Sequence, residues 1–115
     1  MAHESHNIIA VGTNVKDIIN SINEIVRLKG GLVVSAESGE KSIQLNIGGR
    51  MTTRSCEEIA SEYDELNHSV KSLGCEMNAP FMILSFMALL VIPDLKIGDQ
   101  GLFDMKKFEK VSLFL

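Results

Sequence analysis

The stretch from Phe81 to Ile92, FMILSFMALLVI, constrains the fold more than any other part of the chain, because it is apolar on every helical face. It holds no charge and a single hydroxyl, that of Ser85, and Pro80 and Pro93 flank it. Proline suits the first turn of a helix and is poorly tolerated inside one. As a helix the run would span about 18 Å, well short of the roughly 30 Å hydrocarbon core of a membrane. We therefore expect a buried helix, capped by Asn78, and not a membrane anchor.

The composition indicates one globular domain. A chain of 115 residues with 45% hydrophobic and 23% charged residues can form a single core, so residues 1–115 are expected to be one domain. The net charge of -4 argues against nucleic acid or an anionic membrane as a partner, because both need a basic surface. No signal peptide is visible, so we expect the cytoplasm. Cys56 and Cys75 are expected to stay unpaired, because a helix should separate them.

Two segments near the start of the chain follow patterns typical of regular structure. Ile8 to Val11 is a short apolar run that predicts a buried strand. Asn14 and Asp17 resemble a capping box, with Asp in place of the usual Glu or Gln, and predict the start of a helix. Apolar residues then recur at helical spacing as far as Val26, and Gly30 is expected to cap the end of this helix.

The middle of the chain predicts a β-hairpin followed by a second helix. Leu32 to Ala36 and Ser42 to Ile47 are the expected strands. The second strand alternates apolar and polar residues, so one of its faces should be buried and the other wet. Ser55 and Glu58 form a capping box for a helix that Gly74 ends.

The order of the expected elements predicts the fold class. It is βαββα, then the buried apolar helix, then a terminal strand at Val111 to Leu115. No internal repeat or linker interrupts this order. We therefore expect an α+β fold, in which helices pack on a mostly antiparallel or mixed sheet.

Side chains capable of chemistry gather in the N-terminal stretch HESHN. The stretch contains His3, Glu4, Ser5, His6 and Asn7 in consecutive positions. One interpretation is a solvated terminus, because chain ends are usually poorly ordered. The other is a wall of an active site, in which imidazole and carboxylate groups can transfer protons. The spacing alone leaves both open.

Other polar features have plain structural interpretations. The loop that begins at Gly48 and Gly49 is expected to be a turn, because neither a P-loop lysine nor a G-x-G-x-x-G pattern accompanies it. His68 lies away from the apolar stripe of its helix and should be exposed. The acids of the same helix are expected to form a solvated face and not a metal site; they are Glu57, Glu58, Glu62, Asp64 and Glu65.

Longer stretches resemble the C-terminal domain of bacterial and archaeal adenine deaminases, which are metal-dependent amidohydrolases. The resemblance covers nearly the whole chain, and its most specific stretch begins at Pro80. In chain order the matching stretches are HESHN from His3 with IIAVGTN after it, GGLVV from Gly30, IGGRM from Ile47, LGC from Leu73, PFMILSFMALLVIPDLK from Pro80 and GDQGLFD from Gly98. The chain departs from the family at Glu4, where Asp is usual, and at Arg50 and Thr52, where Leu and Ser are usual.

The resemblance implies a role inside a larger enzyme. The full enzymes convert adenine and water to hypoxanthine and ammonia, with a divalent metal, iron or manganese, held on an upstream amidohydrolase barrel. No such metal ligands are recognisable in this chain, so we expect no cofactor in it and no catalysis by it alone. The barrel would be its partner, in cis or in trans. In the complete enzyme His3, Glu4 and His6 are the catalytic candidates, and Asn7 could hydrogen-bond a ring nitrogen of the substrate.

Two functions stay open from the sequence. The first is an auxiliary domain of an adenine deaminase, a cytoplasmic hydrolase of purine metabolism. The second is a free-standing binding or oligomerisation module that reuses this fold. The chain also has more apolar segments than one small core needs, so we expect a homo-oligomer, with a two-fold dimer as the commonest closed form.

Overall fold

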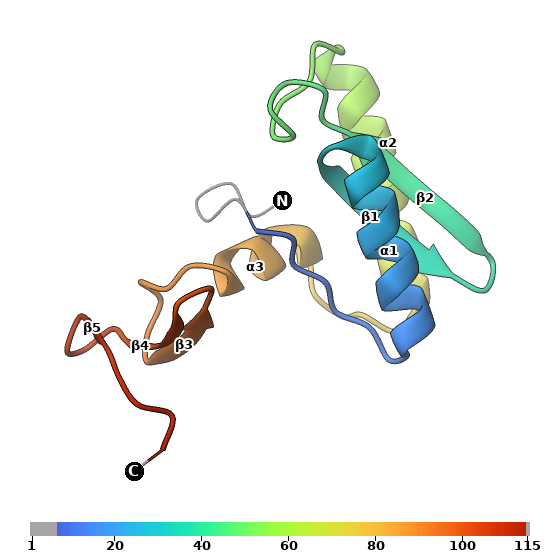
Figure 1. Cartoon of the computed structure of the whole chain (residues 1–115). Helices are drawn as coiled ribbons and strands as arrows, with labels where there is room; N and C mark the ends of the chain where they lie inside the picture. The colour runs from blue at the N-terminus through green and yellow to red at the C-terminus, as the bar shows by residue number, and fades with distance from the viewer. Residues whose placement is uncertain (1–6, 115) are drawn as a thin grey trace.

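The computed structural model describes residues 7–114. Within this range the chain forms three α-helices and five β-strands, arranged in two small antiparallel sheets (Figure 1). The α+β class expected from the sequence is confirmed. The order of elements is αββα followed by a third helix and three short strands.

Helix α1, Val15–Leu28, begins as its sequence predicts. The Asn14 side chain accepts a hydrogen bond from the Asp17 backbone N–H at 2.9 Å, and its amide donates to the Asp17 carboxylate at 2.6 Å. The end of the helix differs by one residue from the prediction. Lys29 is the C-cap in the left-handed conformation, with φ of 58°, and Gly30 follows it.

Strands β1, Gly31–Ala36, and β2, Gly39–Gln44, pair as the predicted hairpin, with Leu32 opposite Ile43. Strand β2 begins and ends three residues earlier than the predicted Ser42 to Ile47, and its length is the same. Ile47 instead makes an isolated bridge to Met51, which closes the following loop. The hairpin therefore stands as a two-stranded sheet of its own.

The two faces of this sheet bind different helices (Figure 1). Helix α2, Cys56–Ser72, covers the apolar face. The core there consists of Val34 and Ile43 of the sheet, Leu45 just after β2, and Leu66 of the helix. Helix α1 lies over the polar face. The prediction that this polar face is wet therefore holds only in part, since α1 lies against its β1 side.

Helix α2 follows its sequence signals closely. Ser55 and Glu58 form the predicted capping box, and Gly74 follows the helix with φ of 94°. Cys56 begins the helix and Cys75 lies beyond its end, and both are free thiols.

The C-terminal part consists of helix α3, Pro80–Met87, and a meander of three short strands. The strands are β3, Leu95–Gly98, β4, Gly101–Asp104, and β5, Glu109–Lys110. Figure 1 shows this part extending away from the body formed by α1, β1, β2 and α2. The radius of gyration is 15.5 Å, whereas a compact domain of this length has about 13 Å.

The prediction of a buried helix from Phe81 to Ile92, capped by Asn78, is wrong. Helix α3 ends at Met87 and is preceded by Ala79 as N-cap, so Asn78 does not cap it. Only Ser85 is buried in this helix, while Met82, Phe86 and Met87 are 55%, 44% and 58% exposed. The reason is that α3 reaches the core through Phe81 alone, whose ring lies 5.9 Å from that of Tyr63.

Both predicted end strands are also wrong, so the order βαββα becomes αββα. Residues from Ile8 to Val11 have no regular structure, and β1 and β2 pair only with each other among the described residues. Val111 to Phe114 form no strand, although the Val111 N–H donates to the Leu102 carbonyl at 2.9 Å. Both sheets have edge strands to which these runs could have paired, so apolar character alone does not make a strand, which also needs a regular ladder of backbone hydrogen bonds.

Candidate functional site

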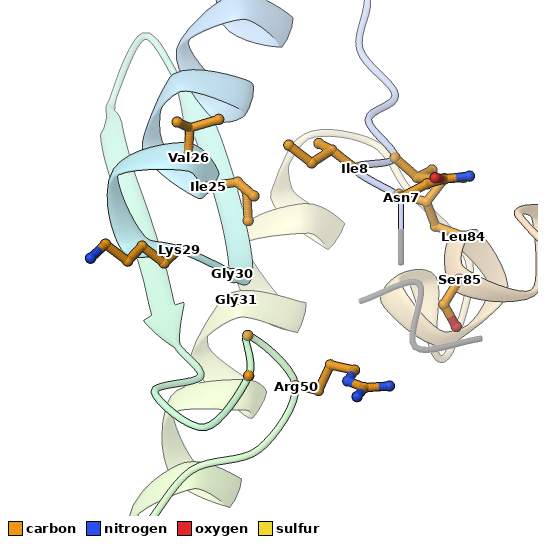
Figure 2. A pocket seen from close by; sticks show the side chains of 13 residues that line it. Asn7, Ile8, Ile25, Val26, Lys29, Gly30, Gly31, Arg50, Leu84 and Ser85 are labelled. Carbon is orange, nitrogen blue, oxygen red and sulfur yellow. The ribbon is translucent and has the colours of Figure 1, made fainter. Parts of the chain in front are cut away.

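A hollow of about 360 Å³ lies between the end of α1, the loop after β2, the N-terminal segment and α3 (Figure 2). Its apolar wall includes Ile8, Ile25 and Leu84, which come from three separate segments. The residues that line it are Asn7, Ile8, Ile9, Ile25, Val26, Lys29, Gly30, Gly31, Gly48, Gly49, Arg50, Leu84 and Ser85. The hollow therefore combines residues of the body with residues of α3 and of the N-terminal segment.

Two glycine pairs line the hollow, and Gly30 of one pair lies in close backbone contact with Gly49 of the other. A Cβ added to Gly30 would lie 2.3 Å from the Gly49 Cα, and one added to Gly31 would lie 2.2 Å from the Ile43 carbonyl oxygen. Gly48 and Gly49 both have positive φ, as the tight turn between Ile47 and Met51 requires. The sequence expectation of a turn at this loop is confirmed.

The polar groups at the hollow are few. Asn7 offers an amide donor and a carbonyl acceptor at its edge, and Arg50 supplies a guanidinium. Figure 2 shows Lys29 pointing away from the hollow, while Arg50 extends along its lower side. Ser85 is buried, and its hydroxyl donates to the Met82 carbonyl at 2.8 Å. That hydroxyl is held by its own helix.

The structure places only one of the predicted site residues and leaves the role of each as a prediction. Asn7, the substrate-binding candidate, lines the hollow and is exposed. The catalytic candidates His3, Glu4 and His6 lie outside the described residues. Within residues 7–114 no three His, Cys, Asp or Glu side chains come together as a possible metal-binding group.

The acids of α2 lie in solvent, as expected, and several of them have partners. Arg54 binds Glu62 with a bidentate pair, in which one N–O distance is 2.8 Å, and this hydrogen bond lowers the pKa of Glu62. Lys41 lies 3.8 Å from the Glu65 carboxylate. His68 is exposed, with Nδ1 at 2.7 Å from the Asp64 carbonyl. These side chains form a solvated helix face.

The walls of the hollow were missed from the sequence. Ile25 was assigned to one helical face and Leu84 to a buried helix, and nothing local indicates that the two meet. The glycine pairs were a usable signal, because adjacent glycines often mark a close backbone approach. In the described part of the chain, no helix combines the length and the hydropathy needed to cross a membrane.

Comparison with known proteins points to one family. Residues 1–109 match the family model described as the adenine deaminase C-terminal domain. The adenine deaminase of Methanosarcina acetivorans is 50% identical over 114 residues, which make up 99% of this chain and 21% of that protein. Those of Methanosarcina mazei and Salinibacter ruber are 48% and 43% identical, over 99% and 100% of this chain.

The chain spans about a fifth of the length of the curated relatives it matches, with 20% of the Methanosarcina mazei enzyme and 21% of the Salinibacter ruber enzyme covered. No solved structure matches the chain significantly.

Proposed function

Because this chain belongs to the adenine deaminase C-terminal domain family, we propose that it is an auxiliary domain of an adenine deaminase and does not catalyse deamination by itself. The reaction of the complete enzyme would be adenine plus water to hypoxanthine plus ammonia, a hydrolytic step of purine metabolism. One observation carries the proposal. Nearly all of this chain aligns with only a fifth of each deaminase, so the remaining four-fifths of those proteins has no counterpart here.

The partner of the domain would be the amidohydrolase barrel, joined in cis or met in trans. When bound there, a divalent iron or manganese ion would lower the pKa of a water molecule and so supply the attacking hydroxide. The contribution of this chain would be positional. Asn7, at the edge of the hollow, could hydrogen-bond a purine ring nitrogen, and His3, Glu4 and His6 are the candidates for orienting the purine or moving a proton.

The setting we propose is a cytoplasmic homo-oligomer that binds neither nucleic acid nor membranes. The free thiols of Cys56 and Cys75 suit a reducing compartment. The net charge of -4 disfavours polyanions and anionic lipid surfaces. Exposed apolar side chains on α3 and at Leu113 and Phe114 offer a contact for a second copy.

A free-standing binding or oligomerisation module is the competing function, and it is less favoured. Such a module could keep the fold while its surface diverged. Instead, essentially the entire chain is 48% and 50% identical to the matched fifth of two adenine deaminases.

A chimera tests the proposal directly. The segment of the Methanosarcina acetivorans adenine deaminase that aligns with this chain would be replaced by this chain, and hypoxanthine formation would be measured. We expect an active chimera, an inactive enzyme when the segment is deleted, and no activity from this chain alone with iron, manganese or zinc. An inactive but folded chimera, or ammonia release by the isolated chain after removal of host enzymes, would refute the proposal.

A further inference from the structure

The apolar stripe of α1 points away from the sheet that carries the helix. The stripe consists of Val15, Ile19, Ile22 and Val26, which fall within about 60° of one another at about 100° per residue. Val15, Ile19 and Val26 are 71%, 50% and 61% exposed. An amphipathic surface helix normally turns such a stripe toward its own core.

Polar contacts hold the opposite side of α1 to the sheet. Glu24 is only 8% exposed and binds Arg27 through N–O distances of 2.6 and 2.5 Å. The Ser42 hydroxyl donates to the same carboxylate at 3.4 Å, and the Gln44 amide donates to the Leu28 carbonyl at 3.0 Å. The orientation of α1 is therefore fixed by specific bonds on the side opposite the stripe. Within the stripe, Val15, Ile19 and Val26 stay exposed and Ile22 is half-buried.

The stripe runs directly into the hollow, because Val26 belongs to both. Figure 2 shows Ile25 on one side of this hollow and Ile8 and Leu84 on the other. Asn7, Ile8 and Leu84 line the hollow from the side opposite α1, and the molecule is longer than a compact domain, at 47 by 31 by 27 Å. The result is a convex apolar ridge that ends in a concavity.

On these grounds, and resting on the proposed function, we infer that the α1 stripe and the adjoining hollow form the docking face for the catalytic four-fifths of an adenine deaminase. The occupant is an apolar element of that part, lying along α1 and inserted beside Val26. The chain lengths support this choice, because about 80% of each relative lies outside the matched segment. Because the matched domain is C-terminal in those proteins, the rest of their chain joins it through the stretch that precedes Asn7. Asn7 itself lines the hollow.

A second copy of this chain fits the face less well. A two-fold interface brings the same patch of both copies together, so the patch must be complementary to itself. Here a two-fold contact centred on the hollow would leave the concavity empty on both sides. The acidic α2 lies on the other face of the sheet and does not obstruct the stripe (Figure 1).

Cysteine footprinting in the chimera tests the docking face. Ile19→Cys and Val26→Cys would be placed in the stripe, with Ile97→Cys as the matched control, since Ile97 is 78% exposed on β3 and outside the face. Maleimide labelling at each site would be followed by peptide mass spectrometry, in the isolated chain and in the chimera. We expect labelling of the stripe at least about tenfold slower in the chimera, because a residue buried in an interface reacts only during transient opening. Labelling at position 97 should stay within about twofold.

Each outcome separates this inference from the proposed function. An active chimera whose stripe labels as fast as in the isolated chain would overturn the docking face and leave the proposed function standing. Concentration-dependent protection in the isolated chain would identify a second copy as the occupant and also overturn it. If the chimera fails to fold, the isolated chain would be titrated onto the truncated deaminase. Weaker binding of the Ile19→Glu variant by about tenfold or more would then support the face, and unchanged binding would reject it.

Discussion

The body formed by α1, β1, β2 and α2 and the C-terminal part formed by α3 and β3 to β5 use apolar residues in opposite ways. Every buried apolar side chain of the described residues lies in the body, namely Leu28, Val34, Ile43, Leu45 and Leu66. The more apolar sequence is the C-terminal one, yet Ser85 is its only buried residue within residues 7–114. Hydropathy therefore states how much a segment gains from burial, while the presence of a packing partner decides whether it is buried.

The core of the body gives the largest expected effect. Leu66→Ala removes a side chain that is 2% exposed among Val34, Ile43 and Leu45, and should lower the free energy of unfolding by about 2 to 5 kcal/mol. Met87→Ala, on a side chain 58% exposed in α3, should change it by less than about 0.5 kcal/mol. Urea unfolding followed by circular dichroism measures both. Equal losses would break the comparison between the two parts.

The close backbone approach beside the hollow is the next most sensitive place. Gly30→Ala combines a φ of 118° with a Cβ that would lie 2.3 Å from the Gly49 Cα, and should cost about 2 to 3 kcal/mol. Gly39→Ala is the matched control, since its φ is 130° and nothing lies within 4 Å of the added Cβ. That control should cost only about 1 kcal/mol of backbone strain. A Gly39 variant as unstable as the Gly30 variant would show that the close approach at the hollow contributes nothing.

The sequence predicts those features of the two parts that depend on residues close together in the chain. Both caps, Asn14 with Asp17 and Ser55 with Glu58, act within one helical turn, so the starts of α1 and α2 were predicted correctly. The hairpin was predicted from the alternation of apolar and polar residues in its second strand. In contrast, the burial of α3 was wrong, because hydropathy says nothing about which neighbour is present.

The site was predictable to a similar degree. Asn7 was singled out for its side-chain chemistry, and the structure places it at the hollow. The roles of Asn7, His3, Glu4 and His6 stay predictions. Ile25, Arg50 and Leu84 meet only through tertiary structure, so no local pattern could group them. The sequence also gave no sign that α1 would bury Glu24 and expose its apolar stripe.

The ion pair between Glu24 and Arg27 predicts that the stability of the body depends on pH. The hydrogen bond from Arg27 lowers the pKa of Glu24 below its ordinary value of 4.5. The charged form is therefore favoured in the folded state, and this stabilisation is complete above pH 4.5 and is lost as the pH falls through the lower, folded pKa. Glu24→Gln should flatten the acid limb of stability against pH.

The control for the acid limb is Glu37→Gln, which removes the same charge from the exposed hairpin turn. Urea unfolding would be repeated at intervals between about pH 3 and about pH 6, which brackets the ordinary glutamate pKa of 4.5. A Glu24 variant whose acid limb is as steep as that of the wild-type chain would show that the pair does not hold α1 in place.

The smallest effect on stability is expected at the end of the C-terminal part. A substitution there should change the association of the chain without changing its folding. Leu113 and Phe114 are 68% and 81% exposed, so replacing both with Ser should change the free energy of unfolding by less than about 0.5 kcal/mol. The same change should remove an apolar contact between copies. Light scattering at micromolar concentration should then give twice the 12.6 kDa chain mass for the wild type and the single mass for the variant. Charge opposes the dimer weakly, because a net -4 per chain is screened beyond about 8 Å at physiological salt.

Val11→Ser, at a side chain 81% exposed in the N-terminal segment, is the control that should stay dimeric. A wild-type chain that is strictly monomeric would mean that the exposed residues of the C-terminal part await only the rest of a longer enzyme.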